Sequence, residues 1–576
     1  MSKRIVIIGG VAAGPKAACR IKRLAPHYEV TVVDQDSLIS YGGCGIPYYV
    51  SGDVADEKEL RSTSFHMVRD ERFFAKAKGV KTLTSTRAVA IDRKAKEVEV
   101  LDLASGESRR LPYDSLLIAT GSKPVVLPIP GHDADGVFSI SDLHQGIAIK
   151  ERLAKAQVGK AVVIGGGAIG IEMAEALTDL WGVETALIEF REQLLPRIID
   201  WPLAVMLEKH LRDNNVAVYL GEGAEEILRD DQGRVTGVRT GKRTLEADLV
   251  IMAAGVRPRS ELAREAGLHV GPGGGIVVNT RMQTSDPTIY AAGDCVEIAH
   301  LVSGKRFVAP FGSMANREGR VAADNIVGIP SVFKGGVASF ILKAFKMSVG
   351  AVGLSTVAAR DEGFAVDFSL TAPSDRAHFY PGQEIVCLQL LFDRRTRRVL
   401  GFQGAGPVND ALSARIDTVA MALAGGATID DLANVEMAYS PPFSSAIDPL
   451  NAAAYVADNL CDGRMRQMTI EEFFLFMDDP SLHPEWTVLD VRHVKQAEPF
   501  VERFGASRWL SLPYDEVRDR YTELPKDRTL AIFCNAGSRS YEVQVFLDSV
   551  DMTNNIVVPG GFNVIRRMGP EWLPVR

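Results

Sequence analysis

Residues 5–14, Ile-Val-Ile-Ile-Gly-Gly-Val-Ala-Ala-Gly, and residues 161–170, Ala-Val-Val-Ile-Gly-Gly-Gly-Ala-Ile-Gly, decide the fold of this chain. In each stretch a short apolar run typical of a β-strand meets a glycine-rich turn, and a helical pattern follows. Each helix leads to a second strand that ends in an acid, Asp34 in the first case and Glu189 in the second. A strand, a glycine turn, a helix and a strand in this order form a βαβ unit. The sequence therefore predicts two folds of the same kind in one chain.

The two glycine turns indicate what these folds bind. A glycine-rich turn presents backbone N–H groups at the positive end of a helix to a pyrophosphate, and an acid about 20 residues later accepts hydrogen bonds from a ribose. The second copy has all the required residues: Gly165, Gly167, Gly170 and Glu189. The first copy has Val11 at the middle glycine position and depends on Gly9, Gly10, Gly14 and Asp34. One such turn could be unrelated to nucleotides, but two in one chain predict two dinucleotide sites.

Three later strand ends indicate which cofactor each site holds. The first two close the nucleotide domains in small-residue turns at Thr120–Gly121 and Gly255. The third, Tyr290-Ala-Ala-Gly293-Asp294, returns to the first domain in two-dinucleotide flavoproteins, where its Asp can bond a ribityl chain. We therefore expect FAD at the N-terminal site and the nicotinamide cofactor at the second. Glu189 would repel a 2′-phosphate, which favours NADH over NADPH, although Arg191 leaves NADPH open.

Composition limits the remaining classes. A chain of 576 residues exceeds one hydrophobic core, so several domains are expected. The net charge of -8 and the absence of a Lys/Arg block give no footprint for nucleic acid. We expect no signal peptide, because the apolar run that follows Arg4 breaks at Gly9-Gly10 and Lys16 arrives without a cleavage-site pattern. We expect no membrane partner, because no apolar stretch approaches the roughly 18 residues that span a bilayer. The six cysteines are scattered without a C-x-x-C pair, which suits a cytoplasmic location and predicts no metal site.

Cys44 lies in the run Ser40-Tyr-Gly-Gly-Cys-Gly-Ile-Pro-Tyr-Tyr49, after the second strand of the first nucleotide fold. A helix is expected to begin directly after it, beside the flavin. A cysteine at a helix N-terminus has a lowered pKa and is a better nucleophile. Taken alone, Cys44 could be a structural residue, but its position in a two-nucleotide flavoprotein predicts a catalytic role.

With these residues the chain resembles the pyridine nucleotide-disulfide oxidoreductases. The resemblance covers about residues 4–451 and is to the single-cysteine branch, which includes coenzyme A-disulfide reductase, NADH oxidase and NADH peroxidase. Members that reduce small dithiols carry C-x-x-x-x-C, and here the fifth position after Cys44 is Tyr49. The resemblance therefore implies that a lone thiolate works through a mixed disulfide, a persulfide or a sulfenate.

The resemblance also implies a coenzyme A site. Basic residues of the first helix that would bind its phosphates correspond to Arg20 and Arg23, and a hydroxyl that contacts the pantetheine corresponds to Ser40. Two catalytic tyrosines contributed by the partner subunit resemble Tyr380 and Tyr439, which could instead pack the dimer interface. The family often has Asn immediately before the cysteine, and this chain has Gly43.

A second cysteine, Cys534, follows the strand Leu530–Phe533 in the loop Cys-Asn-Ala-Gly-Ser-Arg-Ser540. Backbone N–H groups of such a loop surround the sulfur at a helix N-terminus and stabilise a thiolate or persulfide. The loop resembles the rhodanese active-site loop, and the surrounding residues resemble that family over about 468–576. The resemblance implies that Arg539 closes the loop, with Asp490 and Arg492 as structural neighbours. The other cysteines, Cys19, Cys295, Cys387 and Cys461, are assigned to packing.

The expected fold class is α/β, with two Rossmann-like dinucleotide-binding domains, an α+β dimerisation domain and a C-terminal α/β rhodanese domain. The expected boundaries are 1–150 with 276–332 for FAD, 151–275 for NAD(P)H, 333–451 for the dimerisation domain, 452–467 for a helical linker and 468–576 for the rhodanese domain.

The functional hypothesis is a homodimer in which Cys44 reduces coenzyme A persulfide, polysulfide or coenzyme A disulfide at the expense of NADH, while Cys534 carries sulfane sulfur. The expected partners are these small sulfur compounds and coenzyme A. One alternative is an NADH oxidase or peroxidase that cycles Cys44 through a sulfenate. Another is a redox-sensing module that delivers sulfur to a partner.

Overall fold

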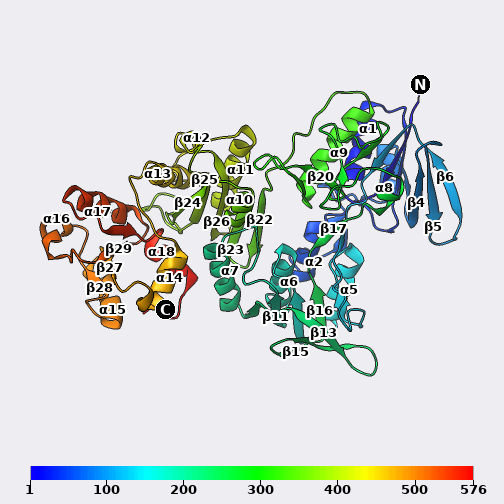
Figure 1. Ribbon diagram of the computed structural model, residues 1–576. Helices are drawn as coiled ribbons and strands as arrows, with labels where there is room; N and C mark the ends of the chain where they lie inside the picture. The colour runs from blue at the N-terminus through cyan, green and yellow to red at the C-terminus, as the bar shows by residue number, and fades with distance from the viewer. Residues whose placement is uncertain (1, 575–576) are drawn as a thin grey trace. The chain divides into compact units, whose positions relative to one another are not determined.

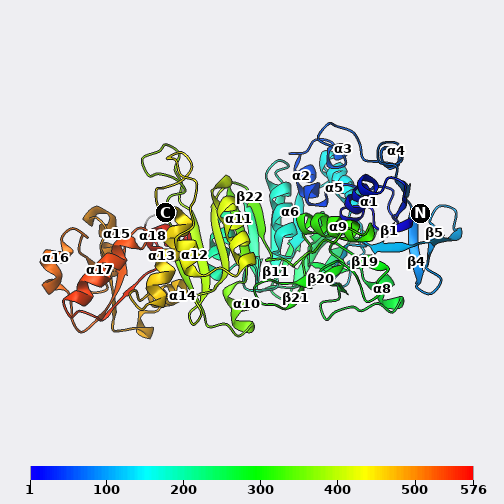
Figure 2. The ribbon, with the colours of Figure 1, turned by 90° about the horizontal axis from the view of Figure 1, so that it is seen from above.

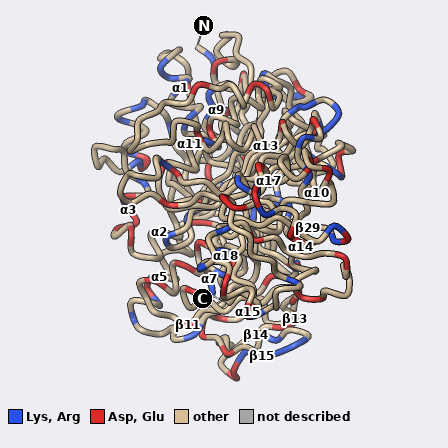
Figure 3. Tube along the Cα trace, turned by 90° about the vertical axis from the view of Figure 1, so that its left-hand side faces the viewer, with Lys and Arg blue, Asp and Glu red and all other residues tan. Residues whose placement is uncertain are grey.

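The computed structural model describes residues 2–574, whose contacts form two units (Figure 1). The first unit contains residues up to 192 and residues 215–336, and the second contains 193–214 and the residues from 337 onward. No helix in the part of the chain that the structure describes is long and apolar enough to cross a membrane. Lys and Arg are interspersed with Asp and Glu among the described residues (Figure 3).

A five-stranded parallel sheet forms the centre of the first nucleotide domain. Its strands, in spatial order, are β19 (Ile289–Ala291), β7 (Ser115–Ile118), β1 (Arg4–Ile8), β2 (Glu29–Val33) and β3 (Lys81–Leu83). Helix α1 (Ala13–Leu24) follows β1, and α9 (Gly312–Ile326) lies beside it in both ribbon views (Figures 1 and 2). Strand β19 pairs in parallel with β7, so the prediction that the segment around Tyr290 returns to the first domain is confirmed.

The second nucleotide domain repeats this architecture. Its parallel strands, in spatial order, are β12 (Val216–Leu220), β11 (Glu184–Glu189), β10 (Lys160–Ile164), β16 (Leu249–Met252) and β9 (Val137–Phe138). Helix α6 (Ala168–Thr178) follows β10, as the glycine pattern predicts. Every residue of β16 and all but the first of β10 are buried, which is why these strands are nearly continuous apolar runs.

Smaller elements complete the first unit. The remaining strands form the antiparallel sheets β4–β5–β6 (Thr86–Asp92, Glu97–Asp102, Ser108–Pro112) and β13–β14–β15 (Ala224–Arg229, Val235–Thr240, Thr244–Glu246), the pair β8 and β17 (Ser122–Pro124, Val256–Pro258), and the sheet β18–β20–β21 (Ile276–Val277, Val296–Ala299, Arg306–Val308). The remaining helices are α2 (Ile46–Ser51), α3 (Glu57–Leu60), α4 (Glu71–Phe73), α5 (Leu143–Ala154) and α8 (Glu261–Glu265).

The second unit contains an antiparallel sheet flanked by helices. Its strands, in spatial order, are β22 (Phe340–Ala344), β23 (Met347–Gly353), β26 (Val399–Pro407), β25 (Cys387–Asp393) and β24 (Val366–Thr371). Its helices are α10 (Thr356–Asp361), α11 (Asp410–Gly425), α12 (Ile429–Ala433) and α13 (Pro449–Cys461). Helix α7 (Trp201–Asp213) contacts β23 and β26 of this sheet, although its residues fall in the range expected for the second nucleotide domain.

The C-terminal part has a four-stranded parallel sheet in the order β28 (Trp509–Ser511), β27 (Trp486–Asp490), β29 (Thr529–Phe533) and β30 (Asn555–Val557). Its helices are α14 (Ile470–Asp478), α15 (Val494–Phe504), α16 (Val517–Arg520), α17 (Ser538–Ser549) and α18 (Gly561–Met568). The expected alternation of parallel strands and helices in this part is confirmed.

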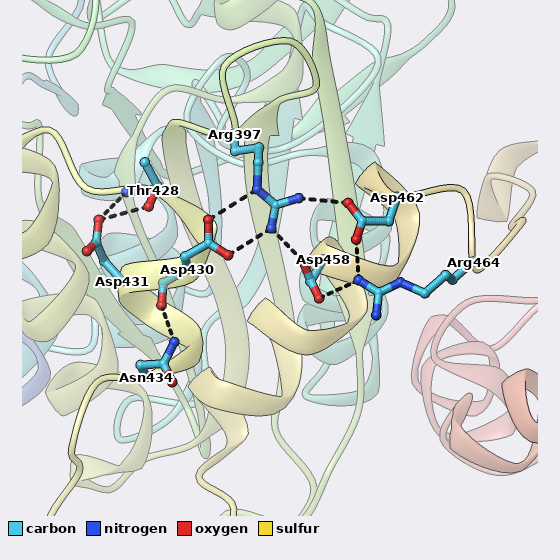
Figure 4. Close-up of polar contacts among 8 residues, drawn as sticks. All are labelled: Arg397, Thr428, Asp430, Asp431, Asn434, Asp458, Asp462 and Arg464. Carbon is cyan, nitrogen blue, oxygen red and sulfur yellow. Dashed lines mark hydrogen bonds and ion pairs between the residues drawn. The ribbon is translucent and has the colours of Figure 1, made fainter.

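The connection to this C-terminal part is not a free linker. Helix α13 packs on β24 and β25, and Arg397 binds Asp430, Asp458 and Asp462 at one end of the helix (Figure 4). Arg464 binds Asp458 and Asp462 as well, so five charges fix the end of α13. Gln467 Nε2 then donates to the carbonyl of Phe368 at 2.7 Å.

Candidate active site

The first glycine turn has the close backbone packing that a dinucleotide fold needs. Gly9 has φ +116°, and a Cβ there would lie 2.0 Å from the carbonyl O of Ala119. A Cβ at Gly14 would lie 1.9 Å from the carbonyl O of Gly9. The N–H of Gly10 donates to Asp34 Oδ2 at 2.5 Å, and burial raises the pKa of Asp34. Only glycine therefore fits at Gly9 and Gly14. The turn also brings the backbone N–H of Gly10 next to the carboxylate of Asp34.

The second glycine turn has the same geometry. Gly165 also has φ +116°, and a Cβ at Gly170 would lie 1.9 Å from its carbonyl O. The N–H of Gly166 donates to Glu189 Oε2 at 2.6 Å. Gly167 differs, because a Cβ there would meet no atom within 4 Å. Open space therefore lies against the N-terminus of α6, where a pyrophosphate could approach the backbone.

The residues that follow the later strands of the two nucleotide domains, from Thr120 to Asp294, lie near these glycine turns. Thr120 Oγ1 donates to the carbonyl O of Arg259 at 2.5 Å. A Cβ at Gly121 or Gly255 would meet no atom within 4 Å. The N–H of Gly293 donates to Glu318 Oε2 at 2.7 Å, and Ser122 donates to Asp294 Oδ2 at 3.1 Å.

Cys44 is the only exposed cysteine among residues 2–574. It lies in a single 3-10 turn, η1 (Gly43–Gly45), that leads into α2. The N-terminus of α9 also reaches it, because a Cβ on Gly312 would lie 3.9 Å from Cys44 Sγ. The sequence analysis missed this helix, since nothing in the local pattern of Gly312 indicates a neighbour so far away in the chain.

The environment of Cys44 does not lower its pKa. Burial of the thiol by the surrounding protein raises the pKa of Cys44, and the carboxylates of Glu172 and Asp294 raise it further. A hydrogen bond from the backbone of Gly312 opposes them. The expected lowering of the Cys44 pKa is therefore wrong for this structure, because burial and the two acids outweigh the backbone hydrogen bonds that favour the thiolate, and the following helix α2 has only 6 residues.

Glu172 is a second residue that the sequence analysis missed. Burial raises its pKa to about 7, and Glu175 on the same helix adds to the shift. Tyr48 lies 3.5 Å from it through its hydroxyl, and the pKa of Tyr48 rises to about 12. A carboxylate in the otherwise apolar stretch Ile171–Ala174 was a usable signal. The structure thus places a group that titrates near neutral pH close to Cys44.

Cations from helix α1 and from neighbouring segments of the chain form a cluster. The positive charges of Lys16, Arg23, Arg69 and Lys78 all act on the Cys19 thiol. The sequence analysis had singled out only Arg23 and Arg20 of this region. The Nε of Arg20 donates to Asp324 Oδ1 at 2.7 Å, so a phosphate at Arg20 would share the guanidinium with this acid.

Ser40 is buried, with a relative exposure of 5%, and has φ +54°. Its N–H donates to the carbonyl O of Gly10 at 2.7 Å, which ties the cysteine segment to the first glycine turn. Positive φ is strained for a serine, so the surrounding contacts hold this bend in place.

Tyr380 and Tyr439 lie in two loops of the second unit that contact each other. The N–H of Ala377 donates to the carbonyl O of Pro441, and Ser445 Oγ donates to that of Arg376. Arg415 on α11 contacts both loops, since its Nη2 donates to the carbonyl O of Asp375 and to Ser444 Oγ, each at 3.4 Å; it is also ion-paired with Asp448 at 2.6 Å. The two tyrosines are exposed, as are Phe379 and Phe443 beside them.

Cys534 directly follows β29 and precedes α17, as predicted, and is 1% exposed. The N–H of Gly537 donates to Cys534 Sγ at 3.1 Å. Asn535 Oδ1 and Ser540 Oγ in the same loop are buried, and neither has a hydrogen-bond partner among the described residues. The loop therefore offers one backbone donor to the sulfur and two unused polar groups next to it.

Arg539 is half-buried, and its charge acts on Tyr514. Within residues 2–574 it makes no hydrogen bond to the cysteine loop. Asp490 and Arg492 form a buried bidentate pair at 2.7 Å, and Trp509 Nε1 donates to Asp490 at 3.0 Å. They support the sheet beneath the loop.

Two glycine-turn nucleotide folds in one chain, with an exposed cysteine close to the first turn, define the class of two-dinucleotide disulfide reductases. Residues 3–314 match the pyridine nucleotide-disulphide oxidoreductase family, and residues 340–450 match the dimerisation domain of the same family. The chain belongs to this family.

Comparison with individual proteins narrows the relationship. An NAD(P)H coenzyme A polysulfide/persulfide reductase of Pyrococcus horikoshii is 36% identical, over 79% of this chain and 98% of its own. An NADH oxidase of Methanocaldococcus jannaschii is 33% identical, over 78% and 98%. The solved NAD-dependent persulfide reductase from A. fulgidus is 37% identical with a TM-score of 0.91, and the match covers 97% of this chain and 99% of that one. The C-terminal domain therefore has a counterpart in a solved relative.

Proposed function

We propose that this protein is an FAD-dependent enzyme that uses NADH to reduce sulfane sulfur, as coenzyme A persulfide or polysulfide, or coenzyme A disulfide. Cys44 is its single redox cysteine, and the rhodanese domain carries persulfide sulfur on Cys534. The observation that carries the proposal is that Cys44, alone among the cysteines of the described chain, is exposed, and that it lies beside the first nucleotide fold. The names of the persulfide reductases that it resembles support the same substrate class.

The residues present fit both cofactors. The first turn, with Gly9, Gly10, Gly14 and Asp34, would hold FAD, and the second, with Gly165, Gly167, Gly170 and Glu189, would hold NADH. The open space at Gly121, Gly167 and Gly255 supports this assignment, because it lies where the cofactors would approach the backbone. When bound, the two cofactors supply hydride and electron transfer.

The chain itself supplies the sulfur chemistry. The Cys44 thiolate attacks a substrate sulfur and forms a mixed disulfide or a persulfide, while the displaced sulfur leaves as a thiol or sulfide. Two electrons that originate in NADH then restore the thiolate. With coenzyme A persulfide the products are coenzyme A, hydrogen sulfide and NAD⁺, and one proton is consumed. Glu172, with a pKa of about 7, can hold that proton close to Cys44.

The remaining sites are assigned by their charge and exposure. The cations around α1, with Arg20 and Arg23 among them, would bind coenzyme A phosphates, and Ser40 would position the pantetheine. Tyr380 and Tyr439 would contact the substrate from the partner subunit of a homodimer. Six free cysteines suit the reducing cytoplasm. The Cys534 loop, with Arg539 at its rim, would carry sulfane sulfur.

The test is anaerobic NADH oxidation by the FAD-loaded protein with coenzyme A persulfide, polysulfide or coenzyme A disulfide. We expect Cys44→Ser to lower turnover at least about 1000-fold, because the nucleophile is lost. Cys461→Ser, a half-buried cysteine outside both sites, serves as the matched control and should retain activity. Cys534→Ser should abolish sulfur transfer from thiosulfate and leave coenzyme A disulfide reduction unchanged.

The resemblance to an NADH oxidase favours one rival. In that case oxygen or peroxide, and no sulfur compound, would drive NADH oxidation, and Cys44 would cycle through a sulfenate. Rapid NADH oxidation with peroxide, and none with any of the three sulfur substrates, would contradict the proposal and identify the protein as an NADH oxidase or peroxidase.

A further inference from the structure

A cavity of about 560 Å³ in the second unit lies outside every site described above. Its lining comes from α7, from the turn between β22 and β23, from the segment before β25, from the end of β26, and from α18. Helices α7 and α18 contact each other there and lie side by side in Figures 1 and 3. Its volume falls in the range of sites for small organic ligands, roughly 300–1,000 Å³.

The lining is positively charged. Four cations, Lys209, Lys346, Arg566 and Arg567, face two acids, Asp213 and Glu384. Lys209 is ion-paired with Asp213, and Arg567 donates to the carbonyl O of Ile385 at 3.3 Å. The side chains of Lys346 and Arg566 have no hydrogen-bond or ion-pair partner in the described part of the chain. The cavity lining therefore has an excess of two positive charges. The side chains of Lys346 and Arg566 are available to bind a ligand.

Stabilisation of the helix dipole does not account for these charges. Arg566 and Arg567 lie in the last turn of α18, where positive charge is favourable by itself. Lys346 lies in a β-turn, however, and Lys209 comes from a different helix. Three separate segments of the chain thus bring cations to one cavity.

The remaining lining contains three polar residues, His210, Gln383 and Asn563, and a group of apolar ones. Met206, Met347, Ile385 and Pro407 give the cavity a nonpolar wall next to the cations. Arginine and lysine together suit phosphate groups, and a nonpolar wall of this kind suits a flat ring. We propose that this cavity is a second ligand site, independent of the catalytic function, that binds a phosphorylated small molecule of the nucleotide class.

The site has a direct connection to Cys534. Asn563 lines the cavity, its N–H donates to the carbonyl O of Asn535 at 2.9 Å, and its side chain donates to that of Ala372 at 3.1 Å. One residue earlier, the N–H of Phe562 donates to the carbonyl O of Cys534 at 2.8 Å. A ligand bound to the far end of α18 would therefore restrain the helix that holds the backbone of the cysteine loop.

The test is calorimetric titration of ADP into the full-length, FAD-loaded protein saturated with NAD⁺ and coenzyme A, so that the two dinucleotide sites and the proposed coenzyme A site are filled. We expect one ADP site per chain, weakened about tenfold or more by Lys346→Gln and by Arg566→Gln. Arg395→Gln, an exposed arginine of the same unit outside the cavity, is the matched control and should leave the affinity unchanged. Hydrogen exchange of the α18 amides should slow on ADP binding in the wild type alone.

Three outcomes would overturn the proposal. The first is no ADP binding at millimolar concentration, and the second is an ADP affinity that neither cavity variant changes. The third is pyrophosphate binding as tight as ADP binding, which would show that the nonpolar wall contributes nothing and that the nucleotide class is wrong. Melting temperatures of both variants equal to the wild type exclude misfolding as the cause of a lost site.

Discussion

At the scale of single residues, the reactivity of Cys44 depends on opposing contributions. Burial and the carboxylates of Glu172 and Asp294 raise the pKa of the thiol, and the N-terminus of α9 stabilises the thiolate. Glu172 is the most adjustable of these groups, because its own pKa is about 7. Near neutral pH the charge close to the nucleophile therefore changes with the protonation of one carboxyl group.

The first prediction concerns Glu172→Gln. We expect the midpoint of the pH profile for Cys44 alkylation to move down by roughly 0.5–1 pH unit, because the variant loses a negative charge that disfavours the thiolate. The rates of variant and wild type should converge below pH 7, since Glu172 takes up its proton there in the wild type. The measurement is the iodoacetamide alkylation rate of the reduced, FAD-loaded protein between pH 6 and 10. Glu184→Gln, at the exposed start of β11, is the control, and an equal shift in it would contradict the argument.

At the scale of elements, the two glycine turns explain how much the sequence could predict. The turn at Gly165–Gly170 is local, since its strand, helix and acid follow each other closely in the chain, and the structure has all of them as predicted. The approach of Gly312 to Cys44 joins segments far apart in the sequence and left no local signal. The raised pKa of Cys44 was missed for the same reason, because the burial that raises it and the carboxylates of Glu172 and Asp294 come from other parts of the chain. Local patterns predicted the two nucleotide folds and the position of Cys44 between strand and helix. Contacts between distant segments of the chain determine the pKa of its thiol.

The second prediction compares two glycines of that turn. Gly170→Ala should prevent correct folding of the second nucleotide domain, because its Cβ would lie 1.9 Å from the carbonyl O of Gly165. Gly167→Ala should fold normally, since its Cβ would meet no protein atom within 4 Å. The new methyl group would instead occupy the space of the cofactor, so we expect the KM for NADH to rise roughly tenfold or more. Melting temperature and steady-state kinetics separate the two effects, and an unchanged KM in Gly167→Ala would place NADH elsewhere.

At the scale of the whole molecule, each unit carries one of the two cysteines to which we assign sulfur chemistry. In the second unit the rhodanese-like domain is held to the antiparallel domain by hydrogen bonds from two segments, one just before α14 and one on α18. Gln467 Nε2 donates to the carbonyl O of Phe368 at 2.7 Å, and Asn563 Nδ2 donates to that of Ala372 at 3.1 Å. Both acceptors belong to β24 or directly follow it, immediately before the loop that carries Tyr380. The charge network of Arg397 fixes the chain just before this junction (Figure 4).

The last prediction concerns this junction. Each of the two hydrogen bonds should contribute about 1 kcal/mol to docking, so the double variant Gln467→Ala/Asn563→Ala should lose about 2 kcal/mol. That loss raises the population of the undocked state about 30-fold. If docking and undocking are fast relative to cleavage, trypsin should cut at Arg464 or Arg466 faster by the same factor. Asn554→Ala, which removes an exposed side-chain hydrogen bond within the rhodanese-like domain, is the matched control and should be cleaved at the wild-type rate. If the double variant resists trypsin as the wild type does, apolar packing and the Arg397 network hold the domain without these two bonds. If it is cleaved faster while coenzyme A disulfide turnover stays unchanged, docking serves the chemistry of Cys534 alone, because reduction at Cys44 then proceeds without a fixed rhodanese-like domain.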